Sequence, residues 1–314
     1  MPEIAVVAIG GNSLIKDKEH QTVPDQYQAV AETCVHIAGM VEAGYEVAIT
    51  HGNGPQVGFI LQRAELARHV LHPVPLDSCD ADTQGAIGYH IQRALGNEFR
   101  RRGIRKQVVT VVTQVVVDAD DPAFRHPSKP IGPFYDREKA LRYQREEGWE
   151  MIEDAGRGYR QVAASPIPQE IVEIESIKAL INIGVVVVAV GGGGIPVVRD
   201  SRGDLTGVAA VIDKDYASSL LAVDIGAELL LISTAVDAVY LNYGQPGQKA
   251  LSRMTVGEAE TFLKEGQFAP GSMEPKIRAA IQFLKKGAGQ VIITSPERMV
   301  ESIRGEAGTM VVAR

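Results

Sequence analysis

Three short apolar runs, each followed at once by a glycine-rich turn, constrain the fold of this chain more than any other feature. They are AVVAIGGNS at 5–13, VAITHGNGPQVG at 47–58 and VVVAVGGGGIP at 186–196. Such β-branched runs are typical of buried strands. In an open parallel sheet the carboxyl ends of the strands form the ligand crevice, where glycines let backbone N–H groups approach an anion. The three turns together predict a polyphosphate site at one edge of a parallel sheet.

Strand and helix patterns alternate along most of the chain. The expected strands are 4–9, 46–50, 108–117, 185–190, 228–233 and 290–294, with a further edge strand at 308–312. The expected helices are 25–42, 83–101, 173–182, 216–225 and 275–286. Alternation of this kind predicts βαβ units and a mostly parallel sheet that is covered on both faces.

The stretch 118–165 breaks this alternation because it is rich in proline, glycine and charge and has no long apolar strand. A structureless loop of this length is improbable inside a compact domain. We therefore expect an inserted lid with a helix near 137–146 and a hairpin, although a surface decoration is an alternative.

Composition excludes several classes of protein. Hydrophobic residues make up 45% and charged residues 23% of the chain, which is typical of globular proteins. A net charge of −7 argues against nucleic acid as a partner. Cys34 and Cys79 lack disulfide or metal spacing, and we find neither a signal peptide nor an apolar run long enough for a membrane span. We therefore expect a cytoplasmic protein.

Neither common nucleotide-binding motif is present. No G-x-x-x-x-G-K-[ST] occurs, and the glycines of GNGPQVG at 52–58 have the wrong spacing for G-x-G-x-x-G. These absences argue against a P-loop ATPase and a dinucleotide-dependent dehydrogenase.

Three lysines stand in unusual contexts: Lys129 in PSKPIGPFY, Lys214 in VIDKDYASSLLA and Lys276 in GSMEPK. Phosphoryl transfer is catalysed mainly by positioning and charge neutralisation, so converging lysines fit that reaction. The alternatives are solvated surface lysines and, for Lys214, a salt-bridged helix start with Asp215 near the N-cap.

No convincing Ser/His/Asp, Cys/His or metal-ligand constellation is visible. His51 is the one histidine inside a motif, and we expect a structural role for it. An acceptor that is already an anion, such as a carboxylate, needs no general base, whereas an alcohol usually does. The sequence thus permits transfer to an ionised oxygen.

Taken together, AIGGNSL, THGNGPQVG, LDSCDADTQGAIGY, PSKPIGPFY, AVGGGGIPVV, VIDKDYASSLLA, DAVYLN and GSMEPK resemble the carbamate kinases of the amino-acid kinase family in order and spacing. The resemblance implies a three-layer α/β/α sandwich with a mainly parallel eight-stranded sheet, a protruding lid and a cytoplasmic homodimer. It also implies reversible conversion of ATP and carbamate to ADP and carbamoyl phosphate, used for ATP formation in the catabolism of arginine.

The resemblance also implies roles for individual residues and segments. Lys129 from the lid would reach the transferring phosphoryl group, Lys214 would neutralise its charge, Asp215 would orient Lys214, and Lys276 would contact the nucleotide phosphates. The phosphoryl and acceptor side would comprise Gly10, Gly11, Asn12, Gly52, Asn53, Gly191, Gly192 and Gly193, and the nucleotide would be surrounded by Asp237, Tyr240, Met273 and Pro275. Nucleotide phosphates rather than side chains would hold Mg²⁺.

In this interpretation one domain, 1–314, has three parts. Residues 1–117 with 166–212 would bind the acceptor and phosphoryl group, 118–165 would form a mobile lid, and 213–314 would bind the nucleotide.

Some positions depart from the family pattern: Ser13, Asp80 with Asp82, and Glu274. Glu274 would weaken the positive potential beside Lys276 or point to solvent, and solvent is the expectation. Two other functions stay open, namely a kinase for an amino-acid carboxylate such as acetylglutamate or aspartate, and a nucleotide or metabolite sensor without turnover. The lid sequence PSKPIGPFY favours the carbamate kinases.

Overall fold

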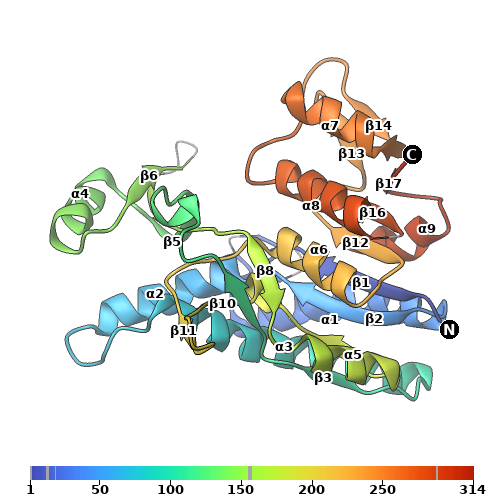
Figure 1. Ribbon diagram of the computed structural model, residues 1–314, viewed down its shortest axis with the longest axis horizontal. Helices are drawn as coiled ribbons and strands as arrows, with labels where there is room; N and C mark the ends of the chain where they lie inside the picture. Colours follow the sequence, from blue (N-terminus) through green and yellow to red (C-terminus); the bar gives the residue numbers. More distant parts are fainter. Residues whose placement is uncertain (1, 12–13, 18, 155–157, 288) are drawn as a thin grey trace.

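An eight-stranded sheet lies between two layers of helices in the computed structural model, which describes residues 2–11, 14–17, 19–154, 158–287 and 289–314 (Figure 1). In order across the sheet, the strands are β15 (Arg253–Thr255), β17 (Thr309–Val312), β16 (Gln290–Thr294), β12 (Leu229–Ser233), β1 (Ile4–Ile9), β2 (Glu46–His51), β9 (Val186–Val188) and β3 (Val108–Thr110). Only the β16–β17 pair is antiparallel among these strands. The predicted fold class, an α/β/α sandwich with a mainly parallel eight-stranded sheet, is confirmed.

Successive side chains of β1 are buried in two separate hydrophobic cores, one on each face of the sheet, as the two-residue period of a strand requires. Ala5, Val7 and Ile9 are buried on one face, and Val6 and Ala8 on the other. The first face is covered by α1 (Val23–Glu42), α3 (Leu76–Arg102) and α9 (Met299–Ile303). The second is covered by α5 (Ile174–Asn182), α6 (Lys214–Asp224), α7 (Val256–Lys264) and α8 (Met273–Lys286).

Two smaller sheets extend this core. One has the strand order β11 (Leu205–Gly207), β10 (Ile195–Arg199), β4 (Gln114–Val117) and β8 (Pro168–Ile171), and the other pairs β13 (Val239–Leu241) with β14 (Lys249–Leu251). The short 3-10 helices in the described residues include η2 (Pro122–Phe124), η3 (Gly191–Gly193) and η4 (Pro296–Arg298).

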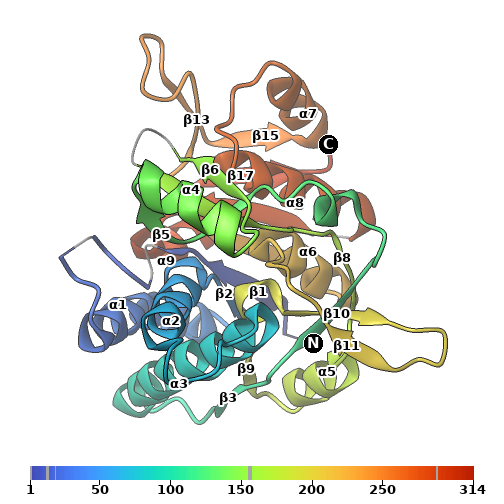
Figure 2. The same ribbon diagram turned by 90° about the vertical axis from the view of Figure 1, so that its left-hand side faces the viewer.

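A separate arm projects from the core between β4 and β8 (Figure 1, Figure 2). It consists of β5 (Lys129–Tyr135), α4 (Arg137–Glu146), β6 (Met151–Glu153) and β7 (Tyr159–Ala163), with the three strands forming their own antiparallel sheet. The rings of Tyr143 and Trp149 stack with centroids 4.5 Å apart and give the arm its own aromatic packing.

The arm rests on α2 (Gly54–Ala67), a helix that the sequence patterns did not predict. The guanidinium of Arg68, which follows α2, donates two hydrogen bonds to the carboxylate of Glu147 in the arm, at 2.6 and 3.0 Å. Near the start of α2, a Cβ on Gly58 would lie 3.2 Å from Cα of Gly132 in β5, so the backbones of α2 and β5 are in close contact.

Two sequence predictions of strands were wrong. The segment 108–117 forms two strands in different sheets, because Thr113 is turned out of the main sheet by hydrogen bonds with the side chain of Gln84. The segment 308–312 contains β17, but β15 pairs with it and takes the edge position. With three residues, β15 is too short for its pattern to be recognised in the sequence.

Replacing Gly88 by alanine should separate α3 from β3. A Cβ at Gly88 would lie 2.3 Å from Cγ2 and 3.0 Å from Cβ of Thr110. Overpacking of this kind costs about 1–3 kcal/mol, so we expect the Gly88→Ala variant to unfold at lower urea concentration. The matched control is Gly257→Ala in α7, where a Cβ meets nothing within 4 Å. Equal stability of the two variants would contradict the packing described for α3.

Candidate active site

The predicted glycine turns lie at the same end of neighbouring parallel strands. Gly10 follows β1, Gly52 follows β2 and Gly191 follows β9, and these strands are adjacent in the order β1–β2–β9. A Cβ on Gly10 would lie 2.9 Å from the carbonyl oxygen of Ser233 at the end of β12. The turns therefore gather where an open parallel sheet places its ligand crevice. Gly11 begins the turn after β1, whereas Asn12 and Ser13 lie outside the described residues.

The turn at 191–193 has no room for side chains. A Cβ on Gly191 would lie 2.3 Å from Nε2 of His51, and one on Gly193 would lie 2.4 Å from the carbonyl oxygen of Ile212. Gly192 has φ +71°, and its Cβ would lie 2.1 Å from Nδ2 of Asn53. These glycines let the backbone after β9 pack against the turn after β2 and the segment that leads into α6.

A buried carboxylate joins two of the predicted lysines. Oδ1 of Asp215 lies 2.5 Å from Nζ of Lys214, and Oδ2 lies 3.0 Å from Nζ of Lys276. Burial alone would raise the pKa of Asp215, but the charges of Lys214 and Lys276 outweigh it and hold that pKa below its usual value. Burial lowers the pKa of the Lys214 ammonium, and Lys276 acts in the same direction while Asp215 opposes it.

The start of α6 positions this ion pair. Asp213 is the N-cap, and its side chain accepts a hydrogen bond of 2.9 Å from the N–H of Asp215, which lies in the first turn. The hydroxyl of Ser218 donates to the carbonyl of Lys214 at 2.6 Å and lies 2.6 Å from the hydroxyl of Thr50 in β2. The sequence predicts Asp215 near the N-cap, and Asp215 lies in the first turn while the cap itself is Asp213.

The arm brings in the third predicted lysine. Nζ of Lys129, at the start of β5, lies 3.2 Å from Oδ2 of Asp213 and 3.4 Å from the carbonyl oxygen of Ile212. Lys129, Lys214 and Lys276 thus gather at the start of α6 although they are far apart in the sequence. Such a cluster of cations beside glycine-rich strand ends is suited to binding phosphate groups.

His51 lies inside the protein beside the turn after β2, and its expected structural role stays a prediction. The ring is fully buried, and its Nδ1 lies 3.0 Å from the carbonyl oxygen of Gly52. Burial lowers the pKa of His51 to about 4, so the ring is neutral near pH 7.

Tyr240 and Met273, two residues predicted around the nucleotide, line a hollow of about 210 Å³. Phe268 and Tyr243 add apolar and aromatic surface to it. Asp237 contributes indirectly, because its carboxylate accepts a hydrogen bond of 2.8 Å from the Tyr240 hydroxyl.

The first turn of α8 borders this hollow. Pro275 lies in that turn between Met273 and Lys276, and it is not among the residues that line the hollow. Glu274 pairs with Arg278, with Oε1 2.8 Å from Nε, so its charge is offset by a cation instead of being left free in solvent.

The residues that fix the turn after β9 were not predicted from the sequence. Nε2 of Gln84 donates to the carbonyl oxygens of Thr113 and Gly191, both at 3.0 Å, and the Thr113 hydroxyl accepts from the N–H of Val190 at 3.0 Å. Val190 has φ +54°, a strained conformation for a β-branched residue that often marks a functional site. The motifs LDSCDADTQGAIGY and AVGGGGIPVV contain Gln84 and Val190, but neither motif predicted the hydrogen bonds that join them to Thr113.

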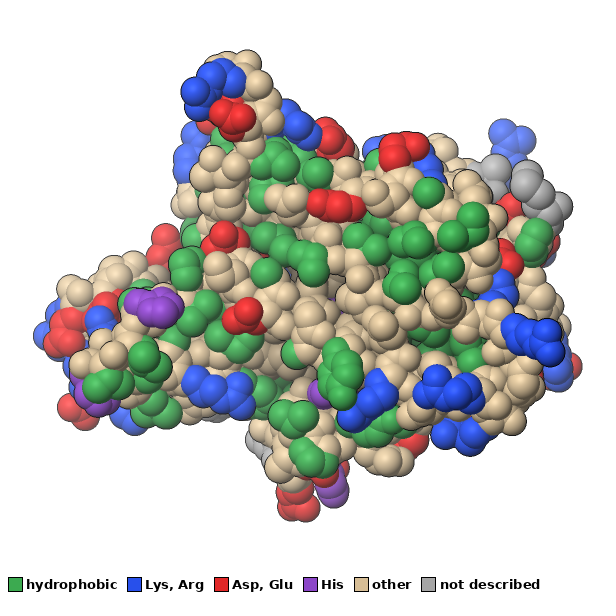
Figure 3. Space-filling view, turned by 90° about the horizontal axis from the view of Figure 1, so that it is seen from below, with side chains coloured by type: hydrophobic (Ala, Val, Ile, Leu, Met, Phe, Trp, Pro, Cys, Tyr) green, Lys and Arg blue, Asp and Glu red, His purple; other side chains and the backbone are tan. Residues whose placement is uncertain are grey.

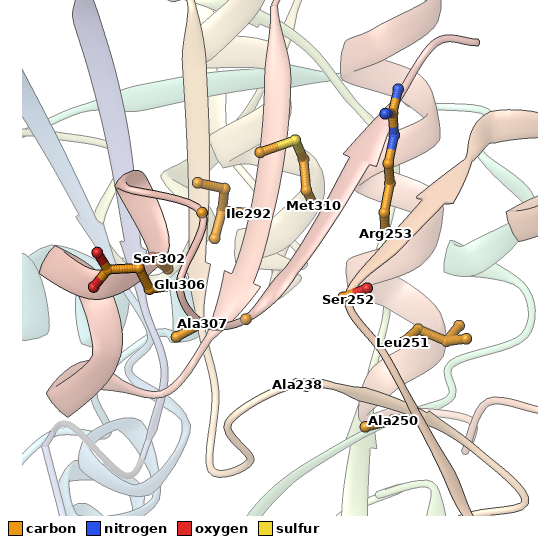
Figure 4. Close-up of a pocket in the computed structure, with 12 residues that line it drawn as sticks. Ala238, Ala250, Leu251, Ser252, Arg253, Ile292, Ser302, Glu306, Ala307 and Met310 are labelled. Carbon is orange, nitrogen blue, oxygen red and sulfur yellow. The ribbon is translucent and has the colours of Figure 1, made fainter.

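A second hollow of about 460 Å³ lies among β14, β15 and β17 and the loop before β17 (Figure 4). Its lining includes Arg253, Glu306 and Met310 and none of the predicted site residues.

Comparison with known proteins agrees with this geometry. Residues 3–295 match the family model described as "Amino acid kinase family". The carbamate kinase-like protein YahI of Escherichia coli is 50% identical over 99% of both chains, and the carbamate kinase of Clostridium perfringens is 48% identical over 98% of this chain and 99% of its own.

Solved structures give the same result. The carbamate kinase from Giardia lamblia bound to AMP-PNP superposes with a TM-score of 0.93 at 40% identity, and the match covers 99% of this chain and 98% of the other. This chain therefore belongs to the amino acid kinase family, in the group that contains the carbamate kinases.

Proposed function

We propose that this chain catalyses the reversible reaction of ATP and carbamate to ADP and carbamoyl phosphate. The observation that carries the proposal is the convergence of Lys129, Lys214 and Lys276 on Asp213 and Asp215 beside the glycine-rich strand ends. Relatives named carbamate kinase, 45–48% identical over nearly the whole chain, support the choice of acceptor.

The reaction needs charge neutralisation more than proton transfer. An ionised carbamate oxygen forms a bond to the γ-phosphorus, while the bond from that phosphorus to the β–γ bridging oxygen breaks and its electron pair leaves with ADP. No proton has to move, so no general base is needed. Lys214 and Lys276 would offset the charge of the transferring group, with Asp215 holding both ammonium groups in place.

The remaining assignments follow the position of each group. Gly10, Gly11, Gly52 and Asn53 would surround the transferring phosphoryl group, with Lys129 reaching it from the arm. Gly191, Gly192 and Gly193 would face the acceptor. Tyr240 and Met273 would contact the nucleotide. Asp237, bonded to Tyr240, and Pro275, in the same helical turn as Met273, would support them. In this proposal 213–314 is the nucleotide part, 1–117 with 166–212 is the acceptor part, and 118–165 is a lid that closes over the crevice.

Mg²⁺ fits this site as a companion of the nucleotide. Both oxygens of Asp215 are bonded to lysines, and Asp213 is engaged by Lys129 and by the N–H of Asp215. In the part of the chain that the structure describes, no cluster of three His, Cys, Asp or Glu side chains is suited to hold a metal ion. When bound through nucleotide phosphates, Mg²⁺ supplies further neutralisation of their charge.

A homodimer is part of the proposal, and its best support is the surface along α3 and β3. β3 is at the edge of the main sheet, Tyr89 and Val112 are more than half exposed, and Arg93 lies 3.7 Å from the centroid of the Tyr27 ring. Viewed from below, the molecule shows hydrophobic patches between charges of both signs (Figure 3). Aromatic residues and arginine are enriched in protein interfaces.

The expected cytoplasmic location and role in arginine catabolism stay predictions. Among the described residues, no helix has the length and apolar character needed to cross a bilayer.

The central test is formation of ATP from ADP, Mg²⁺ and carbamoyl phosphate by the purified protein. We expect ATP well above the amount formed during spontaneous breakdown of carbamoyl phosphate. If none forms, a screen of acetylglutamate and aspartate as acceptors with ATP separates a kinase for another carboxylate from a sensor, which would bind nucleotide and transfer nothing.

Lys214→Met should abolish most turnover. Methionine keeps an aliphatic side chain beside Gly52, where Cδ of Lys214 lies 3.6 Å from the position that a Cβ on Gly52 would take. Loss of one preorganised charge at a transition state lowers kcat by roughly 10²-fold or more. Lys178→Met in α5, where the lysine pairs with Glu175 at the surface, is the matched control. A kcat for Lys214→Met equal to that of the control would remove Lys214 from the mechanism.

Lys129→Ala should lower kcat and leave ADP binding nearly unchanged. The side chain belongs to the arm and contacts Asp213, whereas the hollow assigned to the nucleotide lies on the α8 side of Asp215. Steady-state kinetics and calorimetric titration with ADP check the two effects separately. Selective loss of ADP affinity would place Lys129 on the nucleotide instead.

A further inference from the structure

Asp80 places a carboxyl group inside the protein beside the predicted phosphoryl site. The residue lies in the first turns of α3 and is 1% exposed. Its Oδ1 accepts a hydrogen bond of 2.8 Å from Nδ2 of Asn53. Its Oδ2 is buried and has no hydrogen-bond partner among the described residues. A buried polar atom without a partner is unusual and calls for a functional or chemical explanation.

The surroundings of Asp80 fix the direction in which the Asn53 amide points. The Thr83 hydroxyl donates its only proton to the backbone carbonyl of Asp80 at 2.8 Å, so its oxygen can only accept from Asn53, at 3.0 Å. Nδ2 of Asn53 therefore gives one N–H to Thr83 and the other to Asp80. The amide nitrogen faces α3 while the side chain lies against Gly192, where a Cβ would come within 2.1 Å of Nδ2.

The charged groups that act on Asp80 come from the arm and from its own helix. Burial raises the pKa of Asp80 to about 8, while the hydrogen bond from Asn53 and the charge of Lys129 in β5 lower it and Asp77 raises it. The group is therefore mainly a neutral acid at pH 7. Because Oδ1 accepts from Asn53, Oδ2 is the oxygen that would carry the acid proton.

Ionisation of Asp80 would change the charge available to a phosphate. Lys129, which pairs with Asp213 at 3.2 Å, would then feel a second carboxylate. A negative charge beneath Asn53 would also repel an anion bound at the glycine turns. By linkage, the protein with an ionised Asp80 would bind a phosphate anion more weakly, and a phosphate bound at the glycine turns would favour the neutral acid.

We propose that Asp80 is a positioning residue that holds Asn53 as a neutral acid, and that its ionisation weakens binding of phosphorylated substrate. The proposal rests on the function proposed above for the site. It concerns Asp80, one of the positions at which this sequence departs from the family pattern. Asp82, two residues further along the same helix, is exposed and serves as the matched control.

The test compares the wild type, Asp80→Asn and Asp82→Asn over a pH range that brackets 8. Asn at position 80 can still accept the N–H of Asn53 but cannot ionise. Above pH 8, the KM of the wild type for carbamoyl phosphate should rise by at most about tenfold per pH unit, the limit for one linked proton. Asp80→Asn should lack this rise, and Asp82→Asn should keep it. The same rise in all three proteins would overturn the proposal.

A binding measurement separates failure of this proposal from failure of the proposed reaction. Calorimetric titration with inorganic phosphate needs no turnover, and it should show the same loss of affinity above pH 8 in the wild type and not in Asp80→Asn. If Asp80→Asn does not fold, infrared titration of the wild type remains decisive. One buried carboxylic acid should ionise near pH 8, and at higher pH when phosphate is bound, whereas absence of such an acid would overturn the proposal.

Discussion

The arrangement of the site depends on one buried carboxylate, that of Asp215, between two lysine ammonium groups. Burying an ion pair is costly, and a buried pair is weak evidence for added stability. Removing one partner is far more damaging, because a charge then stays buried without compensation. Both lysines also lie in the first turns of α6 and α8, where the helix dipole disfavours cations. Asp215 offsets these unfavourable effects and keeps two cations where an anion can reach them.

The glycine turns are the second requirement, since cations alone do not make a phosphate site. Backbone N–H groups can approach an anion only where Cβ atoms are absent, and each glycine at 191–193 meets a neighbour that a Cβ would hit. The strained conformation of Val190 is held by its hydrogen bond to Thr113, which Gln84 in turn fixes to α3. The crevice is thus built from turns that the surrounding packing holds in place.

The sequence allowed prediction of features that depend on local patterns. β1 and α4 have the predicted bounds, because the continuous apolar run of β1 and the polar cap before α4 are local signals. The break at 111–113 was missed because it depends on Gln84, 29 residues away. The contact between Lys129 and Asp213 spans 84 residues, so no local pattern could show it. Convergence of the lysines was instead an inference from the needs of phosphoryl transfer, and the structure supplies the aspartates that hold them.

The balance of charge in the crevice connects these elements. Lys129, Lys214 and Lys276 bring three positive charges, and Asp213 and Asp215, paired with them, bring two negative ones. In the proposed function, one net positive charge is therefore left for a phosphate, within a chain whose overall charge is −7. Asp80 leaves this balance unchanged as long as burial keeps its pKa near 8. An exposed aspartate at the same place would be ionised at pH 7 and would cancel the remaining charge, so the proposed binding of an anion depends on the depth at which α3 buries Asp80.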